Sequence, residues 1–157
     1  MVKDDAFRLR SATPEDLPVV LHHRRGMFVD MGYREEAQLD AMEGASAPFF
    51  EQGLRDGTYV GFLAVDGEER VVAGGGVVLL AYQPHPLDPR PRRPFVVNMY
   101  TEPEHRRKGL ARRLMDAMIA WTRKEGYGTL FLHASEAGRP LYLDLGFTPT
   151  NEMRLRL

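Results

Sequence analysis

The chain has 157 residues, of which 43% are hydrophobic, so it can bury a core and we expect a single domain over residues 1–157. The formal net charge of −1 argues against a surface built to bind nucleic acid, and the lack of cysteine excludes disulfides, thiolate metal sites and a cysteine nucleophile. Because Met1–Asp5 lack the apolar core of a signal peptide and no apolar run reaches about 18 residues, we expect a cytoplasmic protein without membrane contact.

The N-terminal part of the sequence predicts a strand followed by helices. Alternating residues favour a strand over 7–10, and capping signals favour a helix over 13–31. A second helical stretch over 35–55 contains Gly44 and Pro48. Because glycine and proline weaken a helix interior, we expect two short helices here rather than one long helix.

A hairpin is predicted next. Strands over 58–65 and 69–82 are joined by the turn signal Asp66-Gly67. The glycine triplet at residues 74–76 lies inside the second strand, where glycines indicate a bulge or a close backbone approach. A proline-rich loop is predicted over 83–94, either bordering the acceptor site or as a hairpin connection on the surface. The surface connection is favoured, because loop length alone is weak evidence for a site.

A strand, a tight turn and a helix form the centre of the sequence. Residues 95–101 are β-branched and aromatic, which favours a strand that stops before Pro103. The helix begins at Gly109 and ends near Glu125. One face of this helix is apolar and carries Leu110, Leu114, Ala117, Met118 and Trp121.

The C-terminal part predicts a strand over 129–134, a short helix over 138–145 and a final strand over 152–157. A strand–helix–strand unit with short joins is a right-handed crossover, so we expect residues 95–101 and 129–134 to run parallel. The element order is βααβββαβαβ, which is an α+β fold.

The turn before the helix that begins at Gly109 has three features of an anion site. Backbone N–H groups over residues 107–112 lack intrahelical partners and lie at the positive end of the helix dipole. The small residues Gly109 and Ala111 allow a close approach to the backbone. The surrounding cations are Arg106, Arg107, Lys108, Arg112 and Arg113. The pattern predicts a pyrophosphate seat, and the alternative is a solvated basic turn.

These residues carry a resemblance to a known family. Arg106-x-x-Gly109-x-Ala111 resembles the [Q/R]-x-x-G-x-[G/A] pattern of the GNAT N-acetyltransferase superfamily. The lead-in over residues 100–105 is similar to the family's, although Thr101 stands where valine is usual. A second segment over 141–147 is similar to the family's L-Y-x-x-x-G-F. The resemblance covers the chain from about Phe7 to the C-terminus.

The resemblance implies a mixed central sheet flanked by helices, with an antiparallel front half and a parallel strand pair that splays apart. It implies acetyl-CoA as co-substrate, no metal, and direct acetyl transfer to a primary amine of a small molecule or peptide. The pantetheine arm of acetyl-CoA would enter the splay and pair with the backbone of Met99 and Thr101. The implied cofactor-binding residues are Met99, Tyr100, Thr101, Arg106, Arg107, Lys108, Gly109, Leu110, Ala111, Arg112 and Ser135. Arg106, Lys108 or Arg112 could meet the 3′-phosphate.

Tyr142 matches the family tyrosine that often gives a proton to the departing thiolate, a role that suits a phenol with an ordinary pKa of about 10. The alternative is a core tyrosine. The N–H of Met99 or Tyr100, freed by a strand bulge, is a candidate oxyanion donor. Ser135 stands where many relatives have an asparagine that contacts the pantetheine. Serine keeps a hydroxyl for this contact but is shorter, and its alternative role is a helix cap.

The base that takes the amine proton is open. The strand over 95–101 carries no acid before Glu102, only Asn98. The candidates are His133, Glu136, Asp30 and Glu35, or a water chain from Asn98 or Tyr142. Histidine is a common general base, and the alternative role of His133 is a buried core histidine.

The acceptor pocket is less specified. By resemblance it involves Arg24, Arg25, Met27, Phe28, Asp30 and Met31, among which Asp30 could hold a cationic amine. His22 and His23 are adjacent on a helix and point apart, so we expect no metal site there.

The missing acid on the central strand leaves a second hypothesis, a non-catalytic acyl-CoA-binding regulatory module. Nucleic-acid binding through the cluster at residues 106–113 is disfavoured by the near-neutral charge, and a homodimer is possible.

Overall fold

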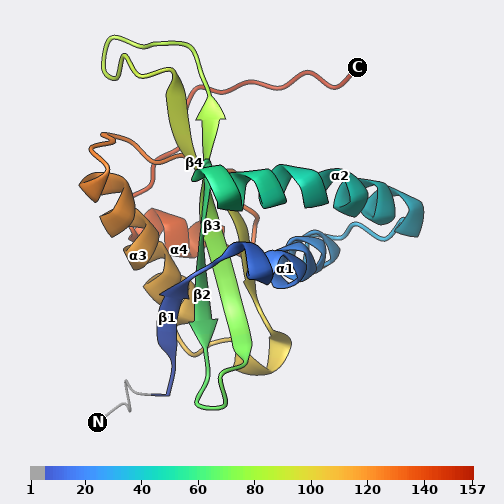
Figure 1. The fold of residues 1–157 in the computed structure, drawn as a ribbon. Coiled ribbons are helices and arrows are strands. Elements are labelled where there is room, and N and C mark those ends of the chain that lie inside the picture. The colour runs from blue at the N-terminus through green and yellow to red at the C-terminus, as the bar shows by residue number, and fades with distance from the viewer. Residues whose placement is uncertain (1–5) are drawn as a thin grey trace.

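Four antiparallel strands form the sheet in the computed structural model, which describes residues 6–157 (Figure 1). In sheet order the strands are β1 (Arg8–Ser11), β2 (Tyr59–Val65), β3 (Val71–Ala81) and β4 (Arg92–Thr101). The expectation of no signal peptide rests on residues 1–5, which lie outside the described part of the chain. The hairpin and the strand before the central turn are confirmed by the pairing of β2 with β3 and of β3 with β4.

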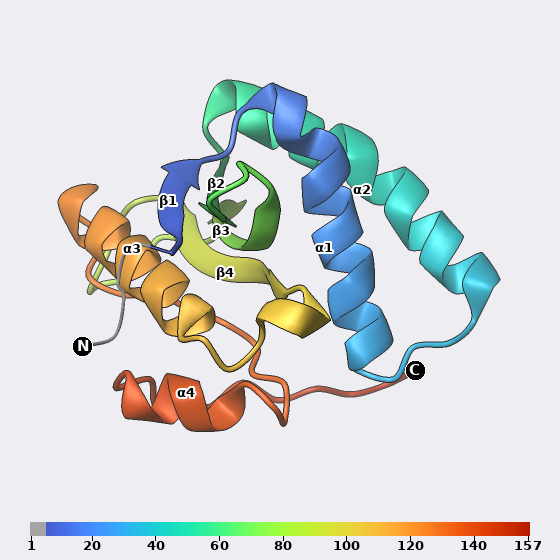
Figure 2. The same cartoon turned by 90° about the horizontal axis from the view of Figure 1, so that it is seen from below.

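The helices lie on both faces of this sheet. They are α1 (Leu17–Asp30), α2 (Glu36–Asp56), α3 (Leu110–Lys124) and α4 (Arg139–Asp144), with 3₁₀ turns at Pro14–Asp16 and Pro103–His105. Figure 2 shows α1 and α2 on one side of the sheet and α3 on the other. Within residues 6–157, no helix has the length and apolar character needed to cross a membrane.

The two faces bury separate cores because side chains alternate along each strand. Val77 of β3 packs with α3, whereas its neighbour Val78 packs with α1 and α2. The α3 side contains the larger cluster, whose buried members are Ala64, Val72, Ala73, Val77, Val96, Leu110, Leu114, Met115 and Met118. The α1 and α2 side buries Val20, Phe50, Tyr59 and Val78.

The glycine triplet of β3 marks both a bulge and a close approach, as the sequence predicted. The register between β3 and β4 shifts between Gly74 and Gly76. A Cβ on Gly75 would lie 2.3 Å from the Met99 sulfur, and one on Gly76 would lie 2.3 Å from the ring of Tyr59. Glycine is needed here because β4 side chains and a buried tyrosine occupy the space that any other residue would fill.

Helix α2 is continuous, so the prediction of two short helices over 35–55 was wrong. Its buried residues are Leu39, Ser46, Phe50 and Gly53, which form one stripe at spacings of seven, four and three. Pro48 lies on the exposed face of the helix. The packing of the stripe against α1 and β2 outweighs the weakening by Pro48 and Gly44.

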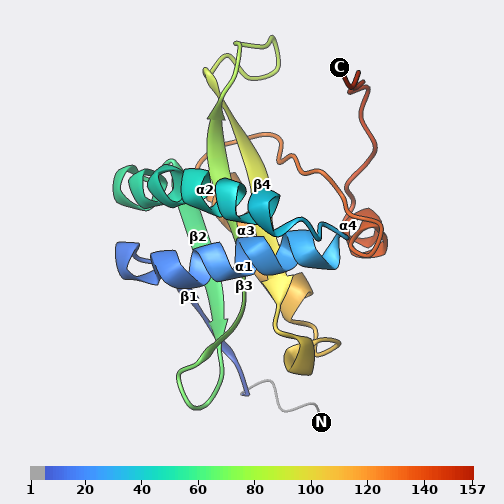
Figure 3. The same cartoon turned by 90° about the vertical axis from the view of Figure 1, so that its right-hand side faces the viewer.

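The predicted parallel strand pair is not confirmed beyond one bridge, and the prediction of a final strand was wrong. Residues 129–134 contribute a single parallel bridge, between Phe131 and Phe95, and every pairing within the sheet is antiparallel. Residues 152–157 pair with no strand among the described residues, and Met153 and Leu155 are 95% and 82% exposed. Figure 3 shows this C-terminal segment extending away from the sheet. Local alternation predicts strand character but cannot supply a partner edge.

We expect Gly76→Ala to lower the free energy of unfolding by about 1–3 kcal/mol, because the added methyl group must displace the buried ring of Tyr59. Gly44→Ala is the matched control. Its Cβ would meet nothing within 4 Å in α2, so it should raise stability by about 0.5–1 kcal/mol. Urea unfolding of both variants measures whether the free energy of unfolding falls or rises. Equal stability of Gly76→Ala and wild type would contradict the close approach of Gly76 to the Tyr59 ring.

His23 is a buried histidine on α1 whose Nε2 has no hydrogen-bond partner among residues 6–157. Burial, and to a smaller degree the neighbouring His22, lowers its pKa from 6.5 to about 4. The unfolded chain therefore binds a proton at a higher pH than the folded protein does. Stability should fall by up to about 3 kcal/mol as the pH drops from about 6.5 through 4.

Urea unfolding at several pH values between 7 and 4 tests this contribution. We expect His23→Gln to lose less stability over that range than wild type, whatever its stability at pH 7. His85→Gln, in the exposed loop after β3, should keep the wild-type pH dependence. Equal pH dependence of the His23 variant and wild type would refute the assignment.

Candidate functional site

The site begins with a bulge in β4 at Asn98. This residue has a φ of 61°, and the register places it with Met99 opposite the single residue Gly75. A bulge adds one residue to a strand and redirects the side chains that follow. Here Val97 and Asn98 both face α1 and α2, while Met99 packs on the α3 side. Asparagine tolerates positive φ better than most residues, which suits it to this position.

The side chain of Asn98 is buried in a polar network rather than free to react. Its Oδ1 accepts a hydrogen bond from Arg24 Nη1 at 3.0 Å, and its Nδ2 donates to the Tyr59 hydroxyl at 3.3 Å. Burial raises the pKa of Tyr59 to about 12, so this hydroxyl stays protonated at neutral pH. The network therefore holds the bulge, and it leaves Asn98 with neither side-chain group free.

Beyond the bulge, β4 and the segment after α3 separate. Val96 N–H donates to the Phe131 carbonyl at 2.8 Å, and Phe131 N–H donates to the Pro94 carbonyl at 3.1 Å. After this bridge the two backbones diverge around a cleft of about 70 Å³. The cleft is lined from α1 by Met27 and Met31, from β4 by Val96, Val97, Asn98 and Met99, and from the C-terminal part by Leu132, His133, Ser135 and Tyr142.

The backbone of Met99 and Thr101 faces this open edge. Glu102 N–H donates to the Val72 carbonyl at 2.9 Å, so residue 102 points toward β3. Because backbone groups alternate along a strand, the N–H and C=O groups of Tyr100 also point toward β3, whereas those of Met99 and Thr101 point away from it. Of the two predicted oxyanion donors, the N–H group of Met99 therefore faces the cleft, whereas the N–H group of Tyr100 points to β3. The Thr101 carbonyl accepts from Arg106 Nε at 2.9 Å.

Tyr142 enters the cleft from α4. Its ring packs edge-on against Phe147 at 6.0 Å between centroids, and burial raises the pKa of its phenol. Ser135 also lines the cleft, and its Oγ accepts a hydrogen bond from Gly138 N–H at 3.1 Å. This contact lies in the turn before α4, whose N-cap is Gly138 and receives no side-chain cap bond, so the cap role of Ser135 stays a prediction.

The first turn of α3 presents free N–H groups. Arg113 N–H is bonded to the Gly109 carbonyl at 3.1 Å, which leaves the N–H groups of Leu110, Ala111 and Arg112 before it without an intrahelical acceptor. Gly109 has a φ of 77°, and a Cβ there would meet nothing within 4 Å. The approach to these N–H groups is therefore open, and the geometry fits an anion.

The cations around this turn differ in their partners. Arg106 points back to α1, where its Nη2 lies 2.7 Å from Asp30 Oδ2, and Arg112 is paired with Asp144. The exposed side chains of Arg107 and Lys108 make no ion pair within residues 6–157. The motif thus groups five basic residues, of which Arg107, Lys108 and Arg113 have no carboxylate partner among the described residues. Arg113 is turned away to the Phe7 carbonyl at 3.1 Å, which leaves Arg107 and Lys108 as the exposed free cations of the turn.

The base candidates are scattered. His133 is exposed at the rim of the cleft, so its alternative reading as a buried core histidine was wrong; its Nε2 lies 3.2 Å from Glu152 Oε1. Asp30 is taken up by Arg106, and Glu35 immediately precedes α2. Glu136 is exposed and does not line the cleft. Of the four candidates, His133 borders the cleft.

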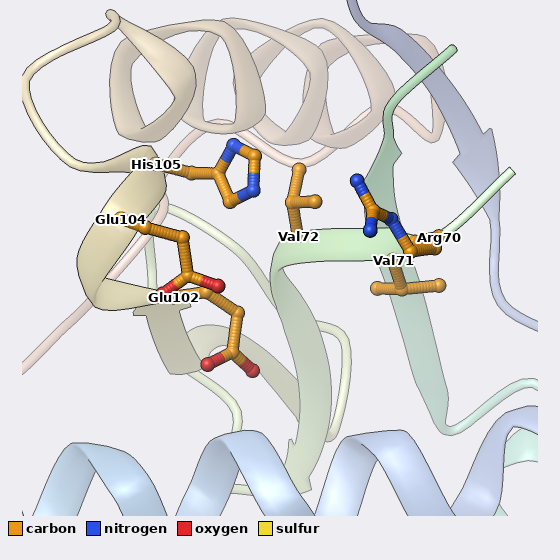
Figure 4. A pocket seen from close by; sticks show the side chains of 6 residues that line it. All are labelled: Arg70, Val71, Val72, Glu102, Glu104 and His105. Atoms are coloured by element: carbon orange, nitrogen blue, oxygen red, sulfur yellow. The ribbon is translucent and has the colours of Figure 1, made fainter. Parts of the chain in front are cut away.

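A larger hollow of about 330 Å³ lies where β3 begins and β4 ends. Figure 4 shows its lining residues, Arg70, Val71, Val72, Glu102, Glu104 and His105. Glu102 also contacts His22, with Oε1 2.6 Å from Nε2. Two carboxylates at this hollow disfavour an anion, so it does not extend the anion site of α3.

Sequence reasoning missed the contact of Arg24 with Asn98, which are 74 residues apart. One local signal was available for the bulge itself, because asparagine is depleted in strands yet tolerates positive φ. No local signal links Asn98 to an arginine on α1.

Residues 6–157 hold no group of three or more His, Asp or Glu side chains that could bind a metal ion.

The arrangement suits an extended ligand with an anionic end. Open N–H groups at α3 can hold phosphate oxygens, the free edge of β4 can pair with amides, and the cleft beside Tyr142 can hold a small reactive group. These are the parts of acetyl-CoA in order, so the residues present fit that molecule.

Comparisons with known proteins agree with this geometry. The model of the acetyltransferase (GNAT) family matches residues 19–147. A GCN5-related N-acetyltransferase from Ralstonia eutropha JMP134 is 33% identical with a TM-score of 0.89, over 96% of this chain and 98% of that one. A predicted acetyltransferase from Clostridium acetobutylicum, solved with acetyl-CoA, is 24% identical with a TM-score of 0.84, over 96% and 95% of the two chains.

A more distant structure shares the fold alone. The aminoglycoside antibiotic 6'-N-acetyltransferase from Acinetobacter baumannii is 16% identical with a TM-score of 0.67, over 96% of this chain and 97% of that one. No curated protein matches the chain.

Two substitutions of equal shape at Gly109 test the anion site. Asparagine and aspartate both tolerate positive φ, and they differ by one negative charge. We expect Gly109→Asp to bind coenzyme A at least about tenfold more weakly than Gly109→Asn, because the carboxylate repels phosphate at the helix N-terminus. Calorimetric titration measures both affinities, and equal binding would place the phosphates elsewhere.

Proposed function

The chain belongs to the GNAT acetyltransferase family, and we propose that it transfers an acetyl group from acetyl-CoA directly to a primary amine of a small molecule or peptide. The proposed catalytic unit is a single domain over residues 1–157. No covalent enzyme intermediate is needed, because the amine can attack the thioester itself.

One observation carries this proposal: the bulge at Asn98 opens a cleft whose wall includes both the backbone of Met99 and the phenol of Tyr142. A thioester carbonyl in that cleft would meet a hydrogen-bond donor for its oxygen and a proton donor for its sulfur. Acyl transfer needs these two groups, since negative charge develops first on the carbonyl oxygen and then on the departing sulfur.

Binding of acetyl-CoA, which supplies the acetyl group, uses backbone more than side chains. The N–H groups at the start of α3 hold the diphosphate, with Arg107 and Lys108 as neighbouring cations. The backbone of Met99 and Thr101 pairs with the pantetheine amides along the free edge of β4. Arg106 supports this edge through its bond to the Thr101 carbonyl. Its ion pair with Asp30 makes it a poor ligand for the 3′-phosphate.

Two side chains move protons in the proposed reaction. His133, at the rim and oriented by Glu152, accepts the proton of the incoming amine. As the carbon–nitrogen bond forms and the carbon–sulfur bond breaks, Tyr142 gives its phenolic proton to the thiolate. The raised pKa of Tyr142 keeps that proton available through neutral and mildly alkaline pH.

The direct test combines cofactor binding with turnover. Calorimetry measures the affinity for acetyl-CoA, and thiol release measures transfer to a panel of primary amines. Tight binding with turnover supports the enzyme, whereas tight binding with no turnover on any amine supports the acyl-CoA-binding module. Absence of acetyl-CoA binding would reject both.

Tyr142→Phe should lower kcat by about 10²–10⁴-fold while the affinity for acetyl-CoA changes little, because the ring and its packing remain and the proton is lost. The matched control is Tyr127→Phe, at a tyrosine that stacks with Arg90 and does not line the cleft. Steady-state kinetics with saturating acetyl-CoA separate the two variants. Wild-type kcat in the Tyr142 variant would remove this residue from the chemistry.

A further inference from the structure

Arg24 on α1 is a half-buried cation surrounded by neutral groups. Its Nε donates to Ser46 Oγ at 3.1 Å and its Nη1 donates to Asn98 Oδ1 at 3.0 Å. Its guanidinium carbon lies 5.0 Å and 5.2 Å from the ring centroids of Phe28 and Phe50. Within residues 6–157 no carboxylate pairs with this guanidinium.

Helix α2 does carry acids near Arg24, as the contacts of the next residue, Arg25, show. Arg25 contacts three carboxylates, Glu36 at 2.7 Å, Asp40 at 3.0 Å and Glu43 at 2.8 Å. Both arginines contact α2, yet three acids of this helix pair with Arg25, whereas Arg24 meets Ser46. The fold therefore leaves the more buried of the two charges without a counter-ion.

Arg24 lies behind the wall of the proposed active-site cleft. Met27 and Met31 follow it on the same face of α1, at spacings of three and seven, and both line the cleft. Asn98, its hydrogen-bond partner on β4, also lines the cleft. The guanidinium is thus joined to the cleft from two elements, on the face opposite the α3 core.

A half-buried charge without a counter-ion is costly in the free protein. Burial lowers the pKa of Arg24 from its ordinary value, which reflects the loss of solvent that no nearby anion replaces. A bound carboxylate or phosphate would offset that loss, and the planar guanidinium favours such oxygen pairs over other ligands. The residues that line the cleft from α1 and its C-terminal cap, Met27 and Met31, are apolar, so they offer an anion no competing contact in front of Arg24.

We propose that the acetyl acceptor is an anionic amine, a molecule that carries a carboxylate or phosphate near its primary amine, and that Arg24 binds this anionic group. The inference rests on the proposed function, because it assigns the second substrate of the same cleft. Asp30, which could have selected a cationic acceptor, is held by Arg106 at 2.7 Å and is not available for that role.

Matched acceptor pairs test this assignment. Phenylalanine is compared with phenethylamine, and O-phosphoethanolamine with ethanolamine, by thiol release at saturating acetyl-CoA. We expect the member that carries the carboxylate or phosphate in at least one pair to have a kcat/KM at least about tenfold above the counterpart that lacks it, which corresponds to about 1.4 kcal/mol. The pair that shows the larger ratio identifies carboxylate or phosphate as the recognised group.

Variants at two adjacent positions locate the recognition. Arg24→Gln keeps a donor for Asn98 but removes the charge, and it should reduce the anionic preference to about twofold or less through the KM of the acceptor. The KM of acetyl-CoA should not change. Arg24→Lys should retain part of the preference. Arg25→Gln, the control at the neutralised arginine, should keep the wild-type preference.

The outcomes separate this inference from the proposed function. Turnover without preference for the acceptors that carry a carboxylate or phosphate, or an unchanged preference in Arg24→Gln, overturns the role of Arg24 and leaves the acetyltransferase intact. If no acceptor of the panel is acetylated, the anionic-amine assignment is rejected. Loss of acetyl-CoA binding by wild type rejects the proposed function, and the inference falls with it.

Discussion

The site depends on one backbone event, the turn of β4 at Asn98. With a φ of 61°, this residue adds one position to the strand, so Val97 and Asn98 share a face and Met99 moves to the other. The shift buries an amide, and an unsatisfied buried amide would cost about 1–3 kcal/mol. Arg24 and Tyr59 supply its partners. The same shift leaves a single bridge to Phe131 and so creates the cleft.

The bulge also depends on the neighbouring strand. Gly75 leaves room for the sulfur of Met99, and Gly76 leaves room for the ring of Tyr59. Because the Tyr59 hydroxyl accepts from Asn98, the space beside β3 and the conformation of β4 are coupled. A side chain added on β3 would act on the cleft through Tyr59, although β3 itself does not line it. The glycine triplet is therefore a requirement of the site as much as of the sheet.

Sequence reasoning succeeded where the signal is local. The helix that follows Gly109, the hairpin at Asp66-Gly67 and the irregularity at the glycine triplet each follow from residues a few positions apart. It failed where distant contacts decide. A buried stripe keeps α2 whole despite Pro48, and the alternating residues 152–157 lack a partner edge. The basic cluster was predicted from its sequence. The ion pair of Arg106 with Asp30 was not, because the two residues are 76 positions apart and no local pattern links them.

The distribution of charge gives the proposals a common basis. Arg25, Arg106 and Arg112 are neutralised by carboxylates of the chain, whereas Arg107 and Lys108 at the α3 turn and Arg24 beside the bulge have no carboxylate partner among the described residues. A diphosphate at the turn and an anionic acceptor at Arg24 would place a counter-ion at each. The free energy lost by half-burying Arg24 is then recovered on binding rather than on folding. A neutral side chain of similar size that donates to Asn98 would avoid the cost of half-burying a charge but could not supply this binding energy.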